Sequence, residues 1–234
     1  MKLSVVVPCY NEAKNLPHLI SRIRECLTRP DCEFILVDNG STDSSPEILA
    51  ALAPDGSLRS VRVATNQGYG YGILAGLRAA RGRYVGWTHA DLQTDPADAL
   101  RALDCIERLG CPRGLYVKGK RHGRPLADVA FTVGMSIFES VYLRAGLWDI
   151  NAQPNILSRE LYEAWKDPPH DFSLDLFAYY QAARLGAQLE RIPVRFGKRL
   201  HGSSHWNVNW RSKWRFIKRT LEFSVRLKQS FSRA

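Results

Sequence analysis

The chain has 234 residues, of which 45% are hydrophobic and 24% charged, a composition typical of a soluble globular protein with a substantial core. Its five cysteines include no Cys-x-x-Cys pair, which argues against a disulfide framework or a zinc site and favours reduced thiols in the cytoplasm. There is no run of 18 apolar residues, and the chain begins directly with a strand pattern, so we expect neither a membrane-spanning segment nor a signal peptide.

The net charge of +10 is concentrated in the C-terminal part of the chain. Residues 195–234 contain eleven Lys and Arg residues against a single acidic residue, Glu222, whereas residues 1–194 contain 22 basic and 22 acidic residues. We therefore expect an anionic partner of this protein to meet its C-terminal end.

The first part of the chain predicts strands that alternate with helices. Residues 3–8 are a nearly continuous β-branched run that stops at a proline, the pattern of a strand buried on both faces of a parallel sheet. Further strands are predicted at 33–37 and 58–63, with a helix after each. Polar or glycine-containing segments follow these strands: Cys9-Tyr10-Asn11-Glu12, Asp38-Asn39-Gly40-Ser41 and Asn66-Gln67-Gly68.

A fourth predicted strand, near residues 84–88, runs into three polar residues at alternating positions, His89, Asp91 and Gln93. In an extended backbone these side chains project from the same side, so an imidazole, a carboxylate and a carboxamide converge. Such a group can bind a divalent cation, either alone or together with a phosphate. Ligands of α/β sheets usually lie at the ends of strands. The alternative is a polar turn that only closes a buried strand.

This alternation predicts an α/β fold with a doubly wound sheet and right-handed crossovers. The polar residues after the first, second and fourth strands are then expected to line a crevice at the carboxyl edge of the sheet. Gly68-x-Gly70-x-Gly72 lacks the spacing of a dinucleotide-binding fingerprint and follows the third strand instead of the first. Its glycines more simply allow the backbone to approach a ligand or a neighbouring helix.

The second part of the chain predicts a helix over 97–109, a strand at 115–117, a long apolar helix over 126–147, a helix over 173–185 and a last strand at 189–196. The long helix either packs in the core or faces lipid. Between the strand and this helix lies a basic, glycine-containing loop, residues 118–125. The loop is either a solvated turn or a cationic segment that closes over a phosphate leaving group.

The tail, residues 206–234, predicts a basic amphipathic helix. Its apolar positions fall on one stripe at helical spacing: Trp206, Trp210, Trp214, Ile217, Leu221 and Val225. Tryptophan beside Lys and Arg is the composition of a helix that lies on an anionic membrane surface, although the tryptophans could instead pack on the body of the protein. No nucleic-acid recognition motif accompanies the basic residues, so we expect no nucleic-acid partner.

Four motifs occur in the order and spacing of the family 2 glycosyltransferases. They are Val-Val-Val-Pro-Cys-Tyr-Asn-Glu at 5–12, Ile-Leu-Val-Asp-Asn-Gly-Ser-Thr-Asp at 35–43, Asn-Gln-Gly at 66–68 and His-Ala-Asp-Leu-Gln at 89–93. The chain most resembles the dolichol-phosphate mannose synthase and polyprenyl-phosphate sugar transferase branch, mainly over its first 125 residues. This resemblance implies a GT-A type doubly wound mixed sheet in residues 1–205, with a Rossmann-like nucleotide-binding half (1–125) and an acceptor half (126–205), followed by the tail helix.

The resemblance also implies an inverting glycosyltransferase that moves a sugar from a nucleotide-diphosphate sugar of the GDP or UDP type to a polyprenyl phosphate. Pro8, Tyr10 and Glu12 would surround the base and ribose, and Asp38 would accept a hydrogen bond from a base N–H. The whole nucleotide-sugar site implied by the four motifs is Pro8, Tyr10, Asn11, Glu12, Asp38, Asn39, Asn66, Gly68, Ala90 and Asp91.

The same resemblance implies that a divalent metal, Mn²⁺ or Mg²⁺, bridges the donor diphosphate, held by His89, Asp91 and Gln93. His89 stands where the branch usually has an aspartate. A neutral imidazole removes one negative charge from the site and favours metals that accept nitrogen. His89 is therefore expected to bind the metal, to contact the diphosphate, or to orient Asp91.

Three residues are candidates for catalysis: Asp91, Arg121 and Asp149. The branch further implies phosphate-binding residues in two basic segments: Lys118, Arg121, Arg124, Arg199, Ser204 and His205. His205 replaces the lysine of the usual Arg-x-x-Gly-x-Ser-Lys pattern. A lipid phosphate is mostly ionised at neutral pH and needs no strong base, whereas a hydroxyl acceptor would need one, for which Asp149, Asp171 and Asp175 are candidates.

Two alternatives remain beside the membrane-associated enzyme. Residues 149–155 depart from the Gly-Phe-Arg pattern of the branch, which leaves open a soluble enzyme that acts on the hydroxyl of a saccharide or another small molecule. The replacement of the first aspartate by His89 leaves open a non-catalytic nucleotide-sugar-binding protein. The preferred interpretation places the protein in the cytoplasm, peripherally on the inner face of the cell membrane.

Overall fold

The computed structural model describes residues 1–52, 56–201 and 210–232. The strands are β1 (Leu3–Cys9), β2 (Cys32–Asn39), β3 (Leu58–Val63), β4 (Tyr84–Trp87), β5 (Leu115–His122), β6 (Asn155–Ser158) and β7 (Gln188–Arg195). The helices are α1 (Leu16–Cys26), α2 (Ser45–Ala50), α3 (Tyr69–Ala79), α4 (Ala97–Arg108), α5 (Leu126–Leu143), α6 (Arg159–Glu163), α7 (Leu174–Arg184) and α8 (Trp210–Ser232).

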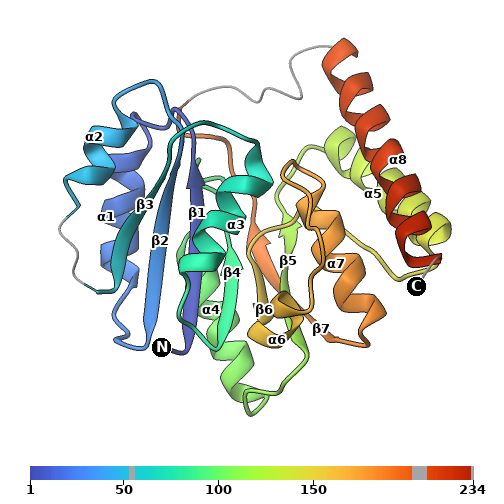
Figure 1. The fold of residues 1–234 in the computed structure, drawn as a ribbon, viewed down its shortest axis with the longest axis horizontal. Helices are drawn as coiled ribbons and strands as arrows, with labels where there is room; N and C mark the ends of the chain where they lie inside the picture. The colour runs from blue at the N-terminus through green and yellow to red at the C-terminus, as the bar shows by residue number, and fades with distance from the viewer. Residues whose placement is uncertain (53–55, 202–209, 233–234) are drawn as a thin grey trace.

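The strands form one seven-stranded sheet in the order β3-β2-β1-β4-β6-β5-β7 (Figure 1). β6 runs antiparallel to its neighbours β4 and β5, and the other pairs are parallel. β1 lies between β2 and β4, so the carboxyl ends of these three parallel strands are adjacent. The predicted mixed, doubly wound α/β sheet is confirmed, and its order places the segments after β1, β2 and β4 at a shared edge.

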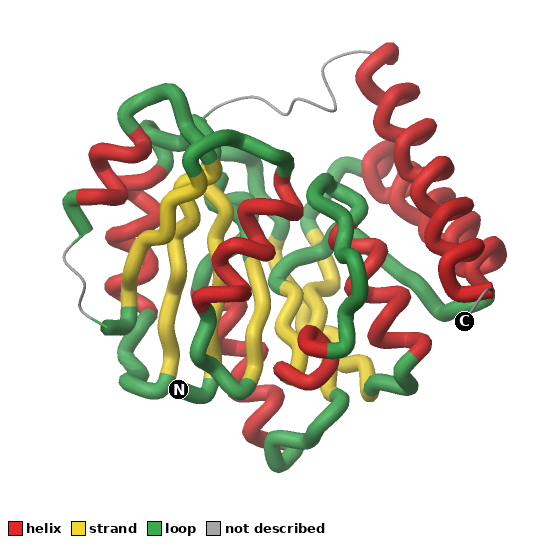
Figure 2. Tube along the Cα trace, viewed as in Figure 1, coloured by secondary structure: helices red, strands yellow, loops and turns green. Residues whose placement is uncertain are grey.

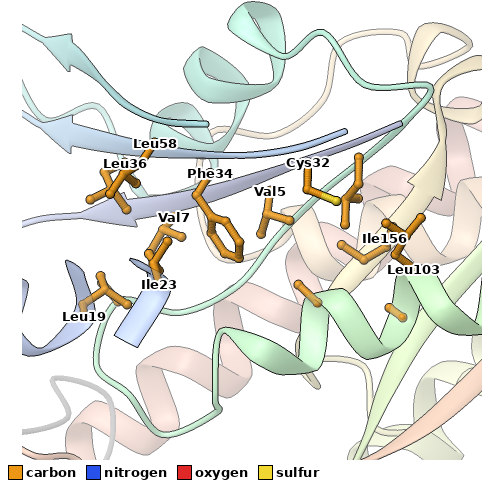
Figure 3. Packing of buried hydrophobic residues seen from close by; sticks show 14 of the residues in the cluster. Val5, Val7, Leu19, Ile23, Cys32, Phe34, Leu36, Leu58, Leu103 and Ile156 are labelled. Atoms are coloured by element: carbon orange, nitrogen blue, oxygen red, sulfur yellow. The ribbon is translucent and has the colours of Figure 1, made fainter. Parts of the chain in front are cut away.

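Helices cover both faces of the sheet (Figure 2). One face packs against α1, α2 and α4, and the other against α3, α6 and α7. Successive β1 side chains point to opposite faces, so Val5 and Val7 belong to the first core and Val6 to the second. Figure 3 shows part of the first core, where Ile23 of α1 lies between Phe34 of β2 and Leu19. This two-sided burial explains why β1 is apolar at nearly every position.

The expected strands near 3–8, 33–37, 58–63 and 84–88 correspond to β1 to β4. Two expectations in the second half were wrong. β5 continues through His122, so residues 118–122 are a strand and not a loop. β6 and α6 were not predicted, because a four-residue strand that is buried along its whole length shows no alternation of polar and apolar residues.

The long helix α5 lies at the side of the molecule and packs beside α8 (Figure 1). It leaves several large apolar side chains in solvent: Leu126, Ile137, Phe138 and Val141. With 18 residues, a mean hydropathy of 1.4 and 17% of this window buried, α5 has the length and composition of a membrane-crossing helix. The expectation that no segment could span a membrane is therefore not confirmed.

α8 contacts the body through a face that only partly overlaps the expected stripe, of which Ile217 and Leu221 are partly buried. Ser224 and Leu227 are buried, whereas Trp214 is 66% and Val225 41% exposed. Trp206, the first member of the expected stripe, lies outside the described residues. The alternative in which the tail packs its tryptophans on the body therefore does not hold for Trp214.

A buried carboxyl group joins α5 to α8. Glu139 is fully buried, and the Ser224 hydroxyl lies 2.8 Å from both of its carboxylate oxygens. Burial raises the pKa of Glu139 from 4.5 to about 7, although the Ser224 hydrogen bond opposes this. The folded state thus favours the protonated carboxyl, whose stabilising effect is full below about pH 4.5 and is lost as the pH rises through about 7.

We expect Glu139→Gln to remove this pH dependence. Between pH 5 and pH 8 the free energy of unfolding of the wild-type chain should fall by about 2–3 kcal/mol more than that of the variant, since each unit of pKa difference corresponds to about 1.4 kcal/mol. Urea denaturation across this pH range measures the difference. Parallel pH profiles for the two proteins would show that Glu139 titrates as it does in water.

Candidate active site

The loops after β1 and β2 brace one another at the carboxyl edge of the sheet. The backbone N–H of Asn11 donates to Ser41 Oγ at 3.1 Å, and Asn11 Oδ1 accepts from the N–H of Thr42 at 2.8 Å. Asn11 has a positive φ of 54°, a conformation that asparagine tolerates better than most residues. Pro8 lies just before this loop and is partly buried, while Tyr10 is 43% exposed. Asn11 thus fixes the backbone of the loop and leaves the Tyr10 ring accessible.

Two side chains at the end of β2 carry buried oxygens without a hydrogen-bond partner among the described residues. Asp38 accepts the N–H of Ser41 at Oδ1, but its Oδ2 makes no hydrogen bond and lies 3.4 Å from Nε of Arg62. Asn39 donates to the carbonyl of Gly68 at 2.9 Å, while its Oδ1 has no partner. Buried acceptors that lack a partner are costly, so this edge suits a ligand that brings N–H or O–H donors.

The glycine-rich segment after β3 lies against the segment before α7. Gly68 has a φ of 113°, and a Cβ there would lie 2.4 Å from the carbonyl oxygen of His170. Its N–H donates to Asn66 Oδ1 at 2.8 Å, and the N–H of Tyr71 donates to the carbonyl of His170 at 2.9 Å. These glycines permit close backbone approach, as expected, here to residues 169–171.

His89, Asp91 and Gln93 occupy a turn, so the argument from an extended backbone was wrong. β4 ends at Trp87, and Leu92 has a positive φ of 56°. Asp91 Oδ1 accepts the N–H of Gln93 at 3.1 Å, the short-range bond by which aspartate stabilises turns. Ala90 and Asp91 are buried, and His89 and Gln93 are partly exposed. The turn, and not an extended strand, brings the side chains of Asp91 and Gln93 to one place, where both contact Arg199.

A guanidinium group lies on the Asp91 and Gln93 side chains. Arg199 Nη2 is 3.0 Å from Asp91 Oδ2, and Arg199 Nε donates to Gln93 Oε1 at 3.2 Å. The side chain of Asp91 is only 7% exposed. The sequence assigned Arg199 to phosphate binding, and its pairing with Asp91 was not foreseen.

Glu12 belongs to the same electrostatic neighbourhood. Burial raises the pKa of Glu12, the nearby charges of Asp91 and Asp43 add to this, and Arg199 opposes it. Asn15 Nδ2 donates to Glu12 Oε2 at 2.5 Å and lies 3.4 Å from the carbonyl oxygen of His201. Glu12 after β1 and Asp91 after β4 are thus close enough to repel each other when both are ionised, and a cation between them would stabilise their charged forms.

His89 differs from these carboxyl groups because it is a base, so that desolvation lowers its pKa. Burial of the ring lowers the pKa of His89, against the opposing charges of Asp91 and Asp175. A neutral imidazole has a free nitrogen lone pair. The chemistry of His89 is therefore that of a nitrogen ligand or a hydrogen-bonding group.

The donor set fits a divalent cation only with help from a ligand. In the described part of the chain, no three His, Cys, Asp or Glu side chains form a group that could hold a metal ion. The turn offers one carboxylate, Asp91, one amide oxygen, Gln93, and an imidazole, His89. The positively charged guanidinium of Arg199 contacts Asp91 and Gln93, where a metal ion would bind. Such a sparse set is typical of metals that take several ligands from substrate phosphates.

A second charged cluster joins β5 to the segment after α5. Arg121 donates from Nε to Asp149 Oδ1 at 2.9 Å and from its backbone N–H to Asp149 Oδ2 at 3.1 Å. Arg124 Nη2 is 3.6 Å from Asp149 Oδ1, and the Asp149 N–H donates to Ser136 Oγ at 3.0 Å. Burial pushes the pKa of Asp149 up, but Arg121 outweighs it and the net pKa is lowered. Asp149 is thus an ionised anchor for two arginines.

Lys118 is not on an exposed loop, contrary to the expectation that it binds phosphate. It is fully buried in β5, and its Nζ donates to the carbonyl of Ala152 at 2.9 Å and to Asn155 Oδ1 at 2.5 Å. Burial lowers the pKa of Lys118 to about 7. A residue whose donors are used inside the protein cannot meet an external phosphate without disrupting the sheet.

Lys118 belongs to a buried polar network that sequence reasoning missed. Asp175 Oδ1 accepts hydrogen bonds from Trp87 Nε1 at 3.0 Å, Asn155 Nδ2 at 2.9 Å and Gln153 Nε2 at 3.2 Å. In the sequence, Gln153 and Asn155 lie two positions apart just before Ile156 and Leu157, a pattern too short to predict the network. The last two predicted phosphate contacts, Ser204 and His205, lie outside the described residues.

The fold is that of the GT-A glycosyltransferases. Among solved structures, glucosyl-3-phosphoglycerate synthase of Mycobacterium tuberculosis, in complex with Mn²⁺, UDP and phosphoglyceric acid, is similar with a TM-score of 0.71 and 19% identity over 97% of this chain and 78% of that one. A mannosyltransferase of Pyrobaculum calidifontis in complex with GDP-Man and Mn²⁺ has a TM-score of 0.68 and 23% identity over 96% of this chain and 64% of that one. These likenesses concern the fold alone.

The chain belongs to glycosyl transferase family 2, whose family model matches residues 4–126. An undecaprenyl-phosphate 4-deoxy-4-formamido-L-arabinose transferase of Yersinia enterocolitica is 39% identical over 111 residues, which are 45% of this chain and 34% of the relative. The corresponding Yersinia pestis protein is 37% identical over 110 residues. The chain thus spans about a third of the length of these relatives. The family resemblance read from the four motifs is confirmed.

Proposed function

We propose that this protein is an inverting glycosyltransferase that moves a sugar from a nucleotide-diphosphate sugar to a polyprenyl phosphate. The observation that carries the proposal is the carboxyl edge of β1, β2 and β4. There, Asp91 and Gln93 hold a cationic group, and at the end of β2 on the same edge Asp38 Oδ2 and Asn39 Oδ1 are buried without a hydrogen-bond partner among the described residues. In a family 2 chain, this edge combines a place for a metal diphosphate with acceptors for a base or ribose. The named relatives, which are similar over 45% of this chain, are undecaprenyl-phosphate 4-deoxy-4-formamido-L-arabinose transferases.

In this proposal Asp91 and Gln93, together with His89, hold Mn²⁺ or Mg²⁺. A metal held there would neutralise charge on the diphosphate and so make it a better leaving group. Tyr10, Asn11 and Glu12 from the β1 loop, with Asp38 and Asn39, bind the nucleoside. Asn66 and Gly68 hold the neighbouring backbone in place. The donor base, GDP or UDP, is left to experiment.

The acceptor phosphate attacks the anomeric carbon directly in this mechanism, which inverts its configuration. Because the phosphate is already largely ionised near pH 7, the protein needs to position it and has no need to deprotonate it. Arg121 and Arg124, fixed by Asp149, supply positive charge for this purpose. Asp149 is poorly suited as a base for a hydroxyl, because Arg121 lowers its pKa and occupies its oxygens.

The proposed acceptor places the protein at the inner face of a membrane. α5 exposes Ile137 and Val141, and the adjacent α8 exposes Trp214 together with the basic residues Lys218 and Arg226. Apolar side chains that project beside Lys and Arg are typical of a surface that enters the headgroup layer of an anionic membrane. This surface supports the membrane-associated enzyme over the soluble alternative.

We expect the protein to float with vesicles of anionic phospholipid and Lys218→Gln/Arg226→Gln to bind them about 10- to 30-fold more weakly, at about 1 kcal/mol for each charge. Flotation at low and high salt measures the partition. Arg108→Gln/Arg113→Gln, which removes two exposed charges near the C-terminal end of α4, is the matched control and should bind like the wild type. Equal loss of binding in the two double variants would contradict a specific membrane face.

The enzymatic proposal is tested by incubating the protein with nucleotide sugars, Mn²⁺ and undecaprenyl phosphate and by searching for a lipid-linked sugar. Donor binding without transfer to any acceptor would support the non-catalytic alternative. Transfer to a saccharide hydroxyl in place of the lipid phosphate would support the soluble enzyme.

A further inference from the structure

The segment after β7 is attached to the turn after β4 through both backbone and side chains. The N–H of Gly197 donates to the carbonyl of Gln93 at 2.7 Å, and Gln93 Nε2 donates to the carbonyl of Gly197 at 3.1 Å. Two residues further along, Arg199 contacts Asp91 and Gln93. A single segment thus engages the two side chains that provide oxygen ligands in the proposed metal site.

The Arg199 contact satisfies an electrostatic need of the turn. A carboxylate that is only 7% exposed, as Asp91 is, is costly to keep ionised without a nearby positive charge. Glu12 adds a second carboxyl group to the same region. The edge of the sheet therefore requires a cation whether or not a substrate is bound, and Arg199 provides one from within the chain.

We propose that Arg199 is a built-in counter-ion that occupies the acidic turn in the ligand-free protein and must be displaced when a divalent metal binds. This inference rests on the proposed function, which assigns Asp91 and Gln93 to the metal. The guanidinium of Arg199 forms an ion pair with Asp91 Oδ2 and donates a hydrogen bond to Gln93 Oε1. A metal ion bound to the same two oxygens would lie next to this positive charge. Metal binding is thus an exchange of cations, and its apparent affinity is reduced by the fraction of protein in the Arg199-bound state.

Displacement by a metal would leave the Arg199 guanidinium without its carboxylate partner. A displaced guanidinium that remains on the segment beside the site needs a new anionic partner, and arginine binds phosphate oxygens in a bidentate manner. A metal-bound nucleotide diphosphate supplies such a partner at the moment when Asp91 is taken away. Metal and nucleotide should therefore bind cooperatively, because the nucleotide stabilises the released position of Arg199.

Binding of Mn²⁺ itself, measured from the electron paramagnetic resonance signal of the free ion, tests the inference without an activity assay. In the absence of nucleotide, Arg199→Gln is expected to bind Mn²⁺ about tenfold more tightly than the wild type, since the competing cation is gone. Addition of UDP or GDP should strengthen Mn²⁺ binding more in the wild type than in the variant. Lys198→Gln is the matched control, because it removes an exposed positive charge next to Arg199 in the same segment.

The result expected for the control is Mn²⁺ binding within about twofold of the wild type. If both variants bind Mn²⁺ more tightly by the same factor, the effect is due to the net charge of the segment and the inference is wrong. The inference is also wrong if the wild type binds Mn²⁺ and Arg199→Gln binds it with the same or a lower affinity. If no protein binds Mn²⁺ even with UDP or GDP present, the metal site of the proposed function fails as well. Circular dichroism spectra of the variants establish that each is folded.

Discussion

Replacing Asp91 by asparagine is expected to lower the kcat of sugar transfer at least about 1000-fold, a loss of about 4 kcal/mol of transition-state stabilisation. Asp91 is the carboxylate that the structure places on the shared edge with Gln93, and the amide of asparagine carries no negative charge with which to hold a metal. Its Oδ1 would still accept the N–H of Gln93, so the turn should remain folded. Steady-state kinetics with excess Mn²⁺ measure the loss.

The matched control for this prediction is Asp104→Asn. Asp104 lies on α4, with a side chain that is 57% exposed, and its contact within the described residues is a 3.6 Å ion pair with Arg29. Its substitution removes the same charge from the protein without altering the proposed site, so kcat should stay within about twofold, as for most surface ion pairs. Transfer by Asp91→Asn at more than a tenth of the wild-type rate would refute the assignment of Asp91.

Replacing Asp149 by alanine is expected to lower the free energy of unfolding by about 3–5 kcal/mol, the cost of removing one partner of a buried ion pair. The side chains of Arg121 and Arg124 are 11% and 8% exposed, so both guanidinium groups would lose their anion in a largely desolvated place. The change would also free Arg121 from its fixed position. Urea denaturation followed by tryptophan fluorescence measures the stability.

A double variant without either charge separates this ion pair from general packing. Arg121→Met/Asp149→Leu removes both charges and keeps apolar volume, and it should recover about half or more of the stability lost in Asp149→Ala. The transfer rate of the double variant should nevertheless remain low, since Arg121 is proposed to position phosphate. A double variant that is no more stable than Asp149→Ala would mean that the ion pair is not the source of the loss.

The N-terminal half could be predicted from sequence because each local signal agrees with the fold. Both faces of β1 and β2 are buried, so β1 is apolar except at Ser4 and β2 is apolar from Phe34 to Val37, and polar residues begin at Asp38 near the carboxyl end of β2. Adjacency of the parallel strands then brings the segments at Glu12, Asp38 and Asp91 to one edge. The four motifs and the order of the strands and helices were therefore enough to predict that these segments meet at one edge of the sheet.

The second half was harder because its decisive contacts are non-local. Lys118 looks like part of a basic loop in sequence, and only the position of Asn155 on the adjacent β6 shows that its ammonium group is buried. β6 itself is too short to show a period. The pairing of Arg199 with Asp91 joins residues more than a hundred positions apart, so no spacing rule could reveal it.

The proposed transfer reaction is tested most directly with a radiolabelled nucleotide sugar. The full chain is incubated with labelled UDP- or GDP-sugars, undecaprenyl phosphate and Mn²⁺, and the label is followed into the organic phase. We expect a lipid-linked sugar of inverted anomeric configuration, lost with EDTA, restored by added Mn²⁺ and absent with Asp91→Asn. Label that stays in the aqueous phase for every donor that binds, or transfer that is unaffected by EDTA, would contradict a metal-dependent polyprenyl-phosphate glycosyltransferase.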